Sequence, residues 1–255
     1  MPLLVAPALP AGSLAAQEQP HLPVRPGLAL RPWRDDDAPA VRAAFDCPVI
    51  QRWHVRRLDS DDEALSWTAQ WAGRWRDESA ASWAVVDADD RPVGQVGLRD
   101  VLLTEASAQV SYWVVPTARG RGIATEALLA LTRWSFTRGG FHRLALEHST
   151  GNEASCRVAG RAGFTEEGVA RGSVRHADGW HDMHRHARLA TSMESGADRD
   201  AGGRSVGVGD PDLGGGRGQQ RRGTAGVRPL AVADPVAQRR PLGGDNDDAL
   251  VVRQR

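Results

Sequence analysis

The sequence has 255 residues and contains no lysine, so all 32 of its basic residues are arginine. A lysine Schiff base and the lysine of an NTP-binding phosphate loop are therefore both excluded. The arginines are balanced by 32 acidic residues, which makes the formal net charge zero at pH 7. A broadly positive surface is thus disfavoured, and we expect neither nucleic acid nor a membrane among the partners.

Cysteine and long apolar runs are also scarce. The chain has two cysteines, Cys47 and Cys156, which are too few for a disulfide framework or a four-thiolate zinc site. Such a low cysteine content is typical of proteins in a reducing compartment. No apolar run approaches the roughly 18 residues that a membrane span needs. The apolar start of the chain has no basic segment and is interrupted by Pro7 and Pro10, so we do not expect a signal peptide. These absences predict a cytoplasmic protein.

The aromatic residues indicate where the chain folds. All of them (9 Trp, 4 Phe and 1 Tyr) lie between Trp33 and Trp180, and aromatic side chains supply much of the apolar area of a core. Residues 194–255 contain none, and 13 Gly and 4 Pro occur among those 62 residues, a composition typical of disorder. We predict an N-terminal arm (1–27), one folded domain (28–190) and a disordered C-terminal tail (191–255).

Within that domain the hydrophobic pattern alternates between strands and helices. Strands are expected at 28–30, 82–86, 93–98, 109–115, 143–147, 173–176 and 184–189. A helix is expected after an N-cap within Asp35–Asp37, through Val41 and Phe45, and further helices at about 60–75, 122–137 and 153–162. The successive strands from residue 82 predict an antiparallel meander in a mixed α/β sheet. Trp67, Trp71 and Trp75 recur every four residues on one helical face, either as a core stripe or as a substrate groove.

The clearest chemical signal is the segment Val114-Val-Pro-Thr-Ala-Arg-Gly-Arg-Gly-Ile-Ala124, in which a strand leads through an Arg- and Gly-rich turn into a helix. The first N–H groups of a helix have no partner within it, and the helix dipole adds positive potential there. Glycines let a phosphate approach the main chain. The segment is interpreted as an anion cradle, with a plain glycine-rich turn as the alternative. The dinucleotide-binding fingerprint Gly-x-Gly-x-x-Gly fits poorly, because Gly120 and Gly122 match its first two glycines but Thr125 occupies the position of the third.

Within this segment, Arg119-Gly-Arg-Gly122-Ile-Ala124 resembles the Arg/Gln-x-x-Gly-x-Gly/Ala motif with which Gcn5-related N-acetyltransferases (GNAT) bind the pyrophosphate of acetyl-CoA. Asn152-Glu-Ala-Ser155, Ala162-Gly-Phe164 and Glu167-Gly168 are similar to signatures of the subfamily that includes ribosomal-protein alanine N-acetyltransferases. The resemblance covers about residues 28–190. It implies an α/β fold with a mixed, mostly antiparallel sheet, splayed at its central strands and flanked by helices.

The resemblance also implies a site for acetyl-CoA as co-substrate. The residues implied are Val114, Val115, Arg119, Gly120, Arg121, Gly122, Ile123, Ala124, Asn152 and Ser155. Backbone groups near Val114 and Val115 would pair with the pantetheine, Asn152 would contact the pantetheine or the substrate, and Ser155 would lie near the sulfur as a candidate proton donor. Helix capping is the alternative for Asn152 and Ser155, and the two roles can coexist.

The general base is less evident. This subfamily often carries a glutamate on the strand before Tyr112, where this chain has Gln109, which cannot accept a proton. Glu147 and His148 end the next strand and face opposite sides of the sheet. Either is a candidate for relaying a proton through water, and a solvated strand end is the alternative.

A group of histidines raises the hypothesis of a metal site, formed by His176, His181, His184, His186 and Asp182. No cysteine is near, and the family resemblance implies no metal. We therefore expect a hairpin packed with tryptophan and histidine and no metal site. Cys156 is expected to be a small buried residue.

The resemblance implies direct transfer of an acetyl group from acetyl-CoA to a primary amine, with a protein N-terminus as the expected acceptor. A small amine such as an antibiotic or a polyamine is one alternative. A catalytically silent acyl-CoA-binding module is another, because Gln109 leaves the base unassigned. The acceptor pocket is expected to be lined by Trp53, His54 and the stripe from Trp67 to Trp75. These residue types do not identify the substrate.

Overall fold

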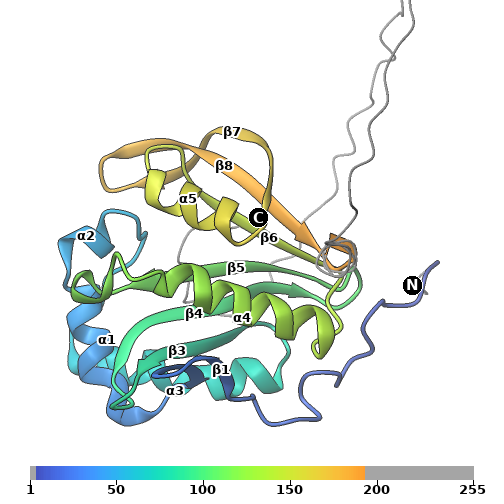
Figure 1. Cartoon of the computed structure of the whole chain (residues 1–255), viewed down its shortest axis with the longest axis horizontal. Coiled ribbons are helices and arrows are strands. Elements are labelled where there is room, and N and C mark those ends of the chain that lie inside the picture. Colours follow the sequence, from blue (N-terminus) through green and yellow to red (C-terminus); the bar gives the residue numbers. More distant parts are fainter. Residues whose placement is uncertain (1–3, 193–255) are drawn as a thin grey trace, which may run out of the picture.

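The computed structural model describes residues 4–192 (Figure 1). They form one eight-stranded sheet in the order β1-β2-β3-β4-β5-β6-β8-β7. The strands are β1 (Leu22–Arg25), β2 (Leu28–Pro32), β3 (Ala81–Asp87), β4 (Pro92–Leu102), β5 (Ser107–Val114), β6 (Arg143–Ser149), β7 (Thr165–His176) and β8 (Gly179–Leu189). The helices are α1 (Ala38–Phe45), α2 (Pro48–Gln51), α3 (Asp61–Arg76), α4 (Ile123–Thr137) and α5 (Glu153–Arg161), with short 3-10 turns η1 (Asp35–Asp37) and η2 (Pro116–Ala118). Residues 193–255 of the predicted tail lie outside the described part of the chain.

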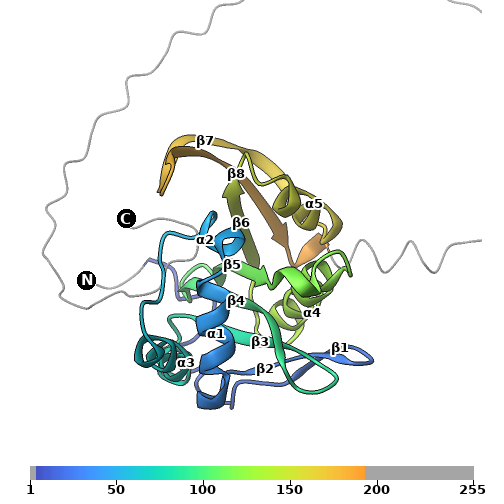
Figure 2. The same ribbon diagram turned by 90° about the vertical axis from the view of Figure 1, so that its left-hand side faces the viewer.

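The sheet divides between β5 and β6. Strands β1 to β5 are antiparallel neighbours, which confirms the predicted meander. β5 and β6 run parallel, but only residues Ser107–Gln109 of β5 pair with β6, at Arg143–Ala145. Beyond these residues the two strands diverge. In Figure 2 the β6, β8 and β7 strands accordingly turn away from the rest of the sheet. The predicted fold class, a mostly antiparallel sheet splayed at its centre, is confirmed.

The core lies on both faces of the sheet. α4 covers one face with Ile123, Leu128 and Leu131, and α1 and α3 cover the other. The three tryptophans of α3 are each at most 5% exposed, with Trp67 and Trp71 in one hydrophobic cluster and Trp75 in the other. The stripe is therefore core.

The predicted start of α3 is confirmed by its cap. The Ser60 side chain accepts a hydrogen bond from the Glu63 N–H at 3.2 Å, and the Glu63 carboxylate in turn accepts one from the Asp59 N–H at 2.5 Å. These bonds satisfy backbone donors that the first turn of a helix leaves unpaired. They set the position from which the three tryptophans enter the core.

The sheet begins earlier in the chain than residue 28. β1 pairs with β2, and Leu9 and Leu14 are buried in the core. The Glu78 carboxylate accepts hydrogen bonds from the backbone N–H groups of Gly12 and Leu14, each at 2.6 Å. Aromatic content was a poor guide to this segment, because leucines and a carboxylate hold it in place.

Candidate functional site

A cavity of about 330 Å³ opens where β5 and β6 diverge. It has two sides, which we name by their residues. The glycine wall comprises the lining residues within 114–125 and those within 152–161, from Asn152 at the N-cap of α5 to Arg161. The histidine wall comprises Trp53, His54, Ser149 and His176. The predicted site residues that line the cavity are Val114, Arg119, Gly120, Gly122, Ile123, Ala124, Glu147, His148, Asn152 and Ser155. Val115 and Arg121 lie outside the lining.

The edge of β5 exposes backbone groups to the gap. Val115 donates its N–H to the Val93 carbonyl at 3.0 Å, within the sheet. Paired residues in an antiparallel ladder alternate between bonded and non-bonded positions, so Val114, opposite Gly94, turns its N–H and carbonyl away from β4 and towards the gap. The Val114 carbonyl accepts from Arg119 Nε at 2.9 Å. The Val115 N–H is thus engaged within the sheet, and the backbone groups that face the gap here are those of Val114.

The turn before α4 takes a shape that favours glycine. Gly120 and Gly122 both have φ of +77°, a left-handed conformation that residues with a Cβ rarely adopt. Gly122 is the N-cap of α4, whose first N–H groups point out of the helix without partners. This arrangement of a glycine turn and a helix N-terminus suits an anion.

Arginines surround this turn. Arg119, Arg157 and Arg161 line the cavity, the last two from α5. Arg157 and Arg161 were missed in the sequence, although their spacing of four on an expected helix places them on one face. Arg121 is exposed and does not line the cavity. The positive charge beside the turn thus comes from two elements.

The start of α5 is capped by a predicted site residue. Asn152 Oδ1 accepts a hydrogen bond from the Ser155 N–H at 3.2 Å, so the capping interpretation of Asn152 is confirmed. Both side chains also line the cavity. The Tyr112 hydroxyl donates to the Ser155 carbonyl at 3.4 Å. Burial raises the pKa of Tyr112 to about 12, so its proton is retained at neutral pH.

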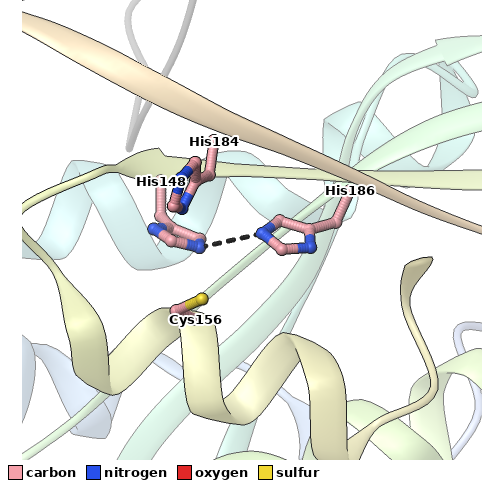
Figure 3. Close-up of side chains that lie close together, drawn as sticks. All are labelled: His148, Cys156, His184 and His186. Carbon is pink, nitrogen blue, oxygen red and sulfur yellow. Dashed lines mark hydrogen bonds between the residues drawn. The ribbon is translucent and has the colours of Figure 1, made fainter. Parts of the chain in front are cut away.

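Glu147 and His148 lie on opposite faces of β6, as expected. The Glu147 carboxylate forms an ion pair with Arg185 Nε at 3.1 Å, across the ladder to β8. His148 is buried, and burial lowers its pKa to about 4, so the ring is neutral at pH 7. The Glu147 carboxylate is thus paired with the Arg185 guanidinium, while His148 faces α5 (Figure 3).

The histidine wall contains functional candidates that sequence reasoning missed or did not place. His176, in β7, is buried, and the backbone of His54 lies beside its ring. Its pKa is lowered, mainly by burial and also by the neighbouring His181. The two imidazole rings are 4.5 Å apart between centroids. A neutral imidazole beside a cavity is a candidate proton acceptor.

A chain of hydrogen bonds through His181 lies beside His176. Ser149 Oγ, which lines the cavity, is 2.7 Å from His181 Nδ1, and His181 Nε2 is 2.7 Å from Asp178 Oδ1. Asp178 follows β7 and His181 lies on β8, so the hairpin turn brings them together. His181 and Asp178 therefore hold one another and Ser149 in place.

The remaining acceptor residues expected from the sequence separate in space. Trp53 and His54 follow α2 and line the cavity, whereas Trp67, Trp71 and Trp75 do not. Burial, with a contribution from Arg99, lowers the pKa of His54 to about 3. Gln109 also lies outside the lining, at the last paired position of β5 with β6.

A second histidine group lies beside the cavity, and it includes a cysteine. Ligand atoms of His148, Cys156, His184 and His186 all lie within 4.8 Å of one another (Figure 3). The expectation that no cysteine is near these histidines is wrong, because α5 packs Cys156 against the strands. Cys156 is half-buried, so the expected burial is only partial.

No helix within residues 4–192 is long and apolar enough to span a bilayer. Comparison with curated proteins finds an uncharacterized N-acetyltransferase, YoaA of Bacillus subtilis, 27% identical over 146 residues, covering 56% of this chain and 82% of that protein. The ribosomal-protein-serine acetyltransferase of Escherichia coli is 27% identical over 105 residues, covering 41% of this chain and 59% of that protein.

Among solved structures, the ribosomal L7/L12 alpha-N-protein acetyltransferase RimL in complex with coenzyme A has the same fold. Its TM-score is 0.61 at 22% sequence identity, covering 67% of this chain and 98% of that one. The family model for the acetyltransferase (GNAT) domain matches residues 27–165, which is more than half of the chain. The splayed sheet, the left-handed glycines before α4 and this match agree, and the chain belongs to the GNAT family of N-acetyltransferases.

Proposed function

We propose that this protein transfers the acetyl group of acetyl-CoA to the α-amino group of a protein N-terminus. The observation that carries the proposal is the cavity at the splay of β5 and β6, with an anion site at one side and a buried neutral histidine at the other. These are the parts that a two-substrate transfer needs: a grip on a phosphorylated donor and an acceptor for the proton of an amine.

The glycine wall suits the phosphates of the donor. Gly120, Gly122 and the first N–H groups of α4 offer hydrogen bonds and a positive dipole, and Arg119, Arg157 and Arg161 add charge. The Val114 N–H faces the gap, where the pantetheine would lie along β5. Asn152 and Ser155 extend this wall towards the reacting end.

The chemistry divides between the two walls. The amine attacks the thioester carbonyl, His176 takes the proton that the amine loses, and the thiolate leaves with a proton from a nearby hydroxyl. Solvent then returns a proton to that hydroxyl and takes the one held by His176. Ser155 and Tyr112 are the two hydroxyls proposed for this role, and the raised pKa of Tyr112 keeps it protonated before the step but makes it the weaker acid. Glu147 and His148 are second candidates for proton relay, although the ion pair to Arg185 holds Glu147.

The pKa values of the amines favour an α-amino acceptor. An α-amino group has a pKa of roughly 7.7–8.0, against roughly 10.4 for a lysine side chain. At pH 7 a larger fraction of the α-amine is therefore neutral and able to attack. His176 then only has to accept the proton that the amine loses as it attacks. The names of the two ribosomal-protein acetyltransferases above agree with this class.

The test uses the full-length protein with acetyl-CoA and three groups of acceptors: peptides with free N-termini, the same peptides with blocked N-termini and one internal lysine, and small amines. Release of free thiol is followed, and mass spectrometry locates the acetyl group. We expect turnover with free N-termini only. Turnover restricted to an antibiotic or a polyamine would refute the acceptor class, and acetyl-CoA binding without thiol release for any amine would indicate a silent binding module. A cytoplasmic location stays a prediction.

A further inference from the structure

Three elements of the fold bring four potential metal ligands to one point. His148 comes from β6, His184 and His186 from β8, and Cys156 from α5 (Figure 3). Their ligand atoms all lie within 4.8 Å of one another, and His148 Nε2 is 3.1 Å from His186 Nε2. None of these positions is on a flexible loop, so the backbone holds the group together.

The register of the sheet explains the arrangement. β6 and β8 are antiparallel, with His148 opposite His184 and Leu146 opposite His186. Alternate residues of a strand share a face, so the three imidazoles project from the same side of the sheet. α5 packs on that side and presents Cys156, which directly follows the cavity residue Ser155.

The hydrogen bonds of the group fit metal ligation. His148 Nδ1 is 2.8 Å from the Ser149 carbonyl, which can only accept, so Nδ1 carries the hydrogen and Nε2 keeps its lone pair. A metal-binding histidine is commonly oriented by such a carbonyl. His184 Nδ1 and His186 Nδ1 are buried without a hydrogen-bond partner among the described residues. Unpaired buried nitrogens are costly, and the group is incomplete as a hydrogen-bond network.

The donor set selects the ion. Three imidazole nitrogens and one thiolate, without a carboxylate, suit Zn²⁺ and are unsuited to Mg²⁺ or Ca²⁺, which need oxygen ligands. Ligands of a tetrahedral Zn²⁺ at about 2.0–2.3 Å lie roughly 3.3–3.8 Å apart. The observed separations, from 3.1 to 4.8 Å, bracket that range.

The charge of the surroundings is also suitable. Binding releases the thiol proton of Cys156 to solvent, so Zn²⁺, one thiolate and three neutral imidazoles would carry a net charge of +1. Glu166 lies directly opposite His186 in the β7–β8 ladder, and its carboxylate offsets part of this excess. Cys156 and His184 are half-buried, which leaves a path for the ion.

We propose that His148, Cys156, His184 and His186 form a Zn²⁺ site that fastens α5 to β6 and β8. Four protein ligands close the coordination sphere, so the ion is structural and not an additional catalyst. It holds the start of α5, with Asn152 and Ser155, against the strands that line the cavity. The proposal does not depend on which amine is acetylated.

Zinc binding to the full-length protein, prepared without a histidine tag and stripped by a chelator, tests the site. Competition with a chromophoric chelator measures affinity, and Co²⁺ in place of Zn²⁺ reports the ligands by its visible spectrum. We expect one ion per chain, a tetrahedral Co²⁺ spectrum with a thiolate-to-metal charge-transfer band, and a melting temperature that rises with Zn²⁺. Cys156→Ser and His184→Gln should each weaken binding by about 10²-fold or more.

Two matched variants serve as controls. Cys47→Ser removes the other thiol, and His142→Gln removes an exposed histidine outside the group. Both should bind Zn²⁺ as the parent protein does. Less than one ion per chain in the parent protein, equal affinity in Cys156→Ser, or a Co²⁺ complex without the charge-transfer band would each overturn the proposal. Circular dichroism of the stripped variants shows whether they are folded, and His184→Gln gives a second reading if Cys156→Ser is not.

Discussion

The two walls of the cavity are built in different ways. The glycine wall uses backbone conformation: two left-handed glycines, the unpaired N–H groups of α4 and the outward-facing Val114 come from one short stretch of chain. The histidine wall gathers side chains from the end of α2, from β6 and from β7. The part of the glycine wall at residues 114–125 is one local segment and can be predicted from a motif. Its α5 part and the histidine wall exist only once the strands have their register and α5 is packed.

The two walls are also expected to do different work. The turn of the glycine wall at residues 119–122 is proposed to bind, so variants there should change affinity for acetyl-CoA. The histidine wall accepts a proton, so its variants should change the rate with little change in that affinity. The four predictions below compare these two effects, beginning with the largest.

The largest effect is expected at His176. Replacing it with Asn removes the proposed proton acceptor, and kcat/KM for a peptide should fall by about 10²-fold or more, the usual contribution of a general base. Because burial lowers the pKa of His176 from 6.5, the parent enzyme has this base neutral at pH 7, and its kcat/KM should decline as pH falls through that pKa. The variant should lack this decline. Steady-state rates from pH 5 to pH 9 measure both effects.

His142→Asn is the matched control for this variant, because His142 is exposed and lies outside the cavity lining. It should leave kcat/KM unchanged at every pH. Calorimetric titration with acetyl-CoA should give the same affinity for His176→Asn as for the parent protein. If His176→Asn retains the parent kcat/KM, the proton passes elsewhere, and the division between the walls fails.

The second effect concerns Gly122. A glutamate there must adopt φ of +77°, its Cβ would lie 3.2 Å from Glu126 Oε1, and its charge would oppose a phosphate. Affinity for acetyl-CoA should fall by at least about 10-fold, equivalent to about 1.4 kcal/mol. Gly122→Ala introduces the backbone strain without the charge, so its affinity for acetyl-CoA should lie between those of the parent protein and Gly122→Glu. Calorimetric titration of folded Gly122→Glu with unchanged affinity would remove the turn from the binding site.

These walls show why part of the site could be predicted and part could not. Periodicity located the meander, α4 and α5, and the glycine motif located the turn with two left-handed glycines before α4, because each depends on neighbours in the chain. The pairing of His148 with His184 depends on the register of β6 and β8, and the meeting of Cys156 with both depends on how α5 packs. No pattern along the chain encodes those distances. Similarly, the buried Leu9 and Leu14 carry no periodic signal in a segment rich in proline and alanine.

The third effect is smaller, because two hydroxyls share one task. Ser155→Ala and Tyr112→Phe should each lower kcat by about 10-fold, with unchanged affinity for acetyl-CoA, since a proton donor acts mainly in the transition state. A thiolate is a fair leaving group, with a thiol pKa of about 8.5 for cysteine, which limits the loss. Single-turnover rates measure the step. A single variant that keeps the parent rate would mean that the other hydroxyl donates alone.

The smallest effect is expected at Arg121, and it separates the sequence motif from the geometry. Both Arg119 and Arg121 belong to the motif, but only Arg119 lines the cavity, where its Nε donates to the Val114 carbonyl at 2.9 Å. Arg121 is exposed outside the lining, so screening by water and salt leaves it little influence on a bound phosphate. Arg121→Ala should therefore change the dissociation constant for acetyl-CoA by less than about 2-fold, and Arg119→Ala should raise it by about 10-fold. Titration of the two variants at one ionic strength compares them directly, since each removes one positive charge from the same turn. Equal losses would mean that net charge near α4, and not the position of the guanidinium in the glycine wall, determines binding.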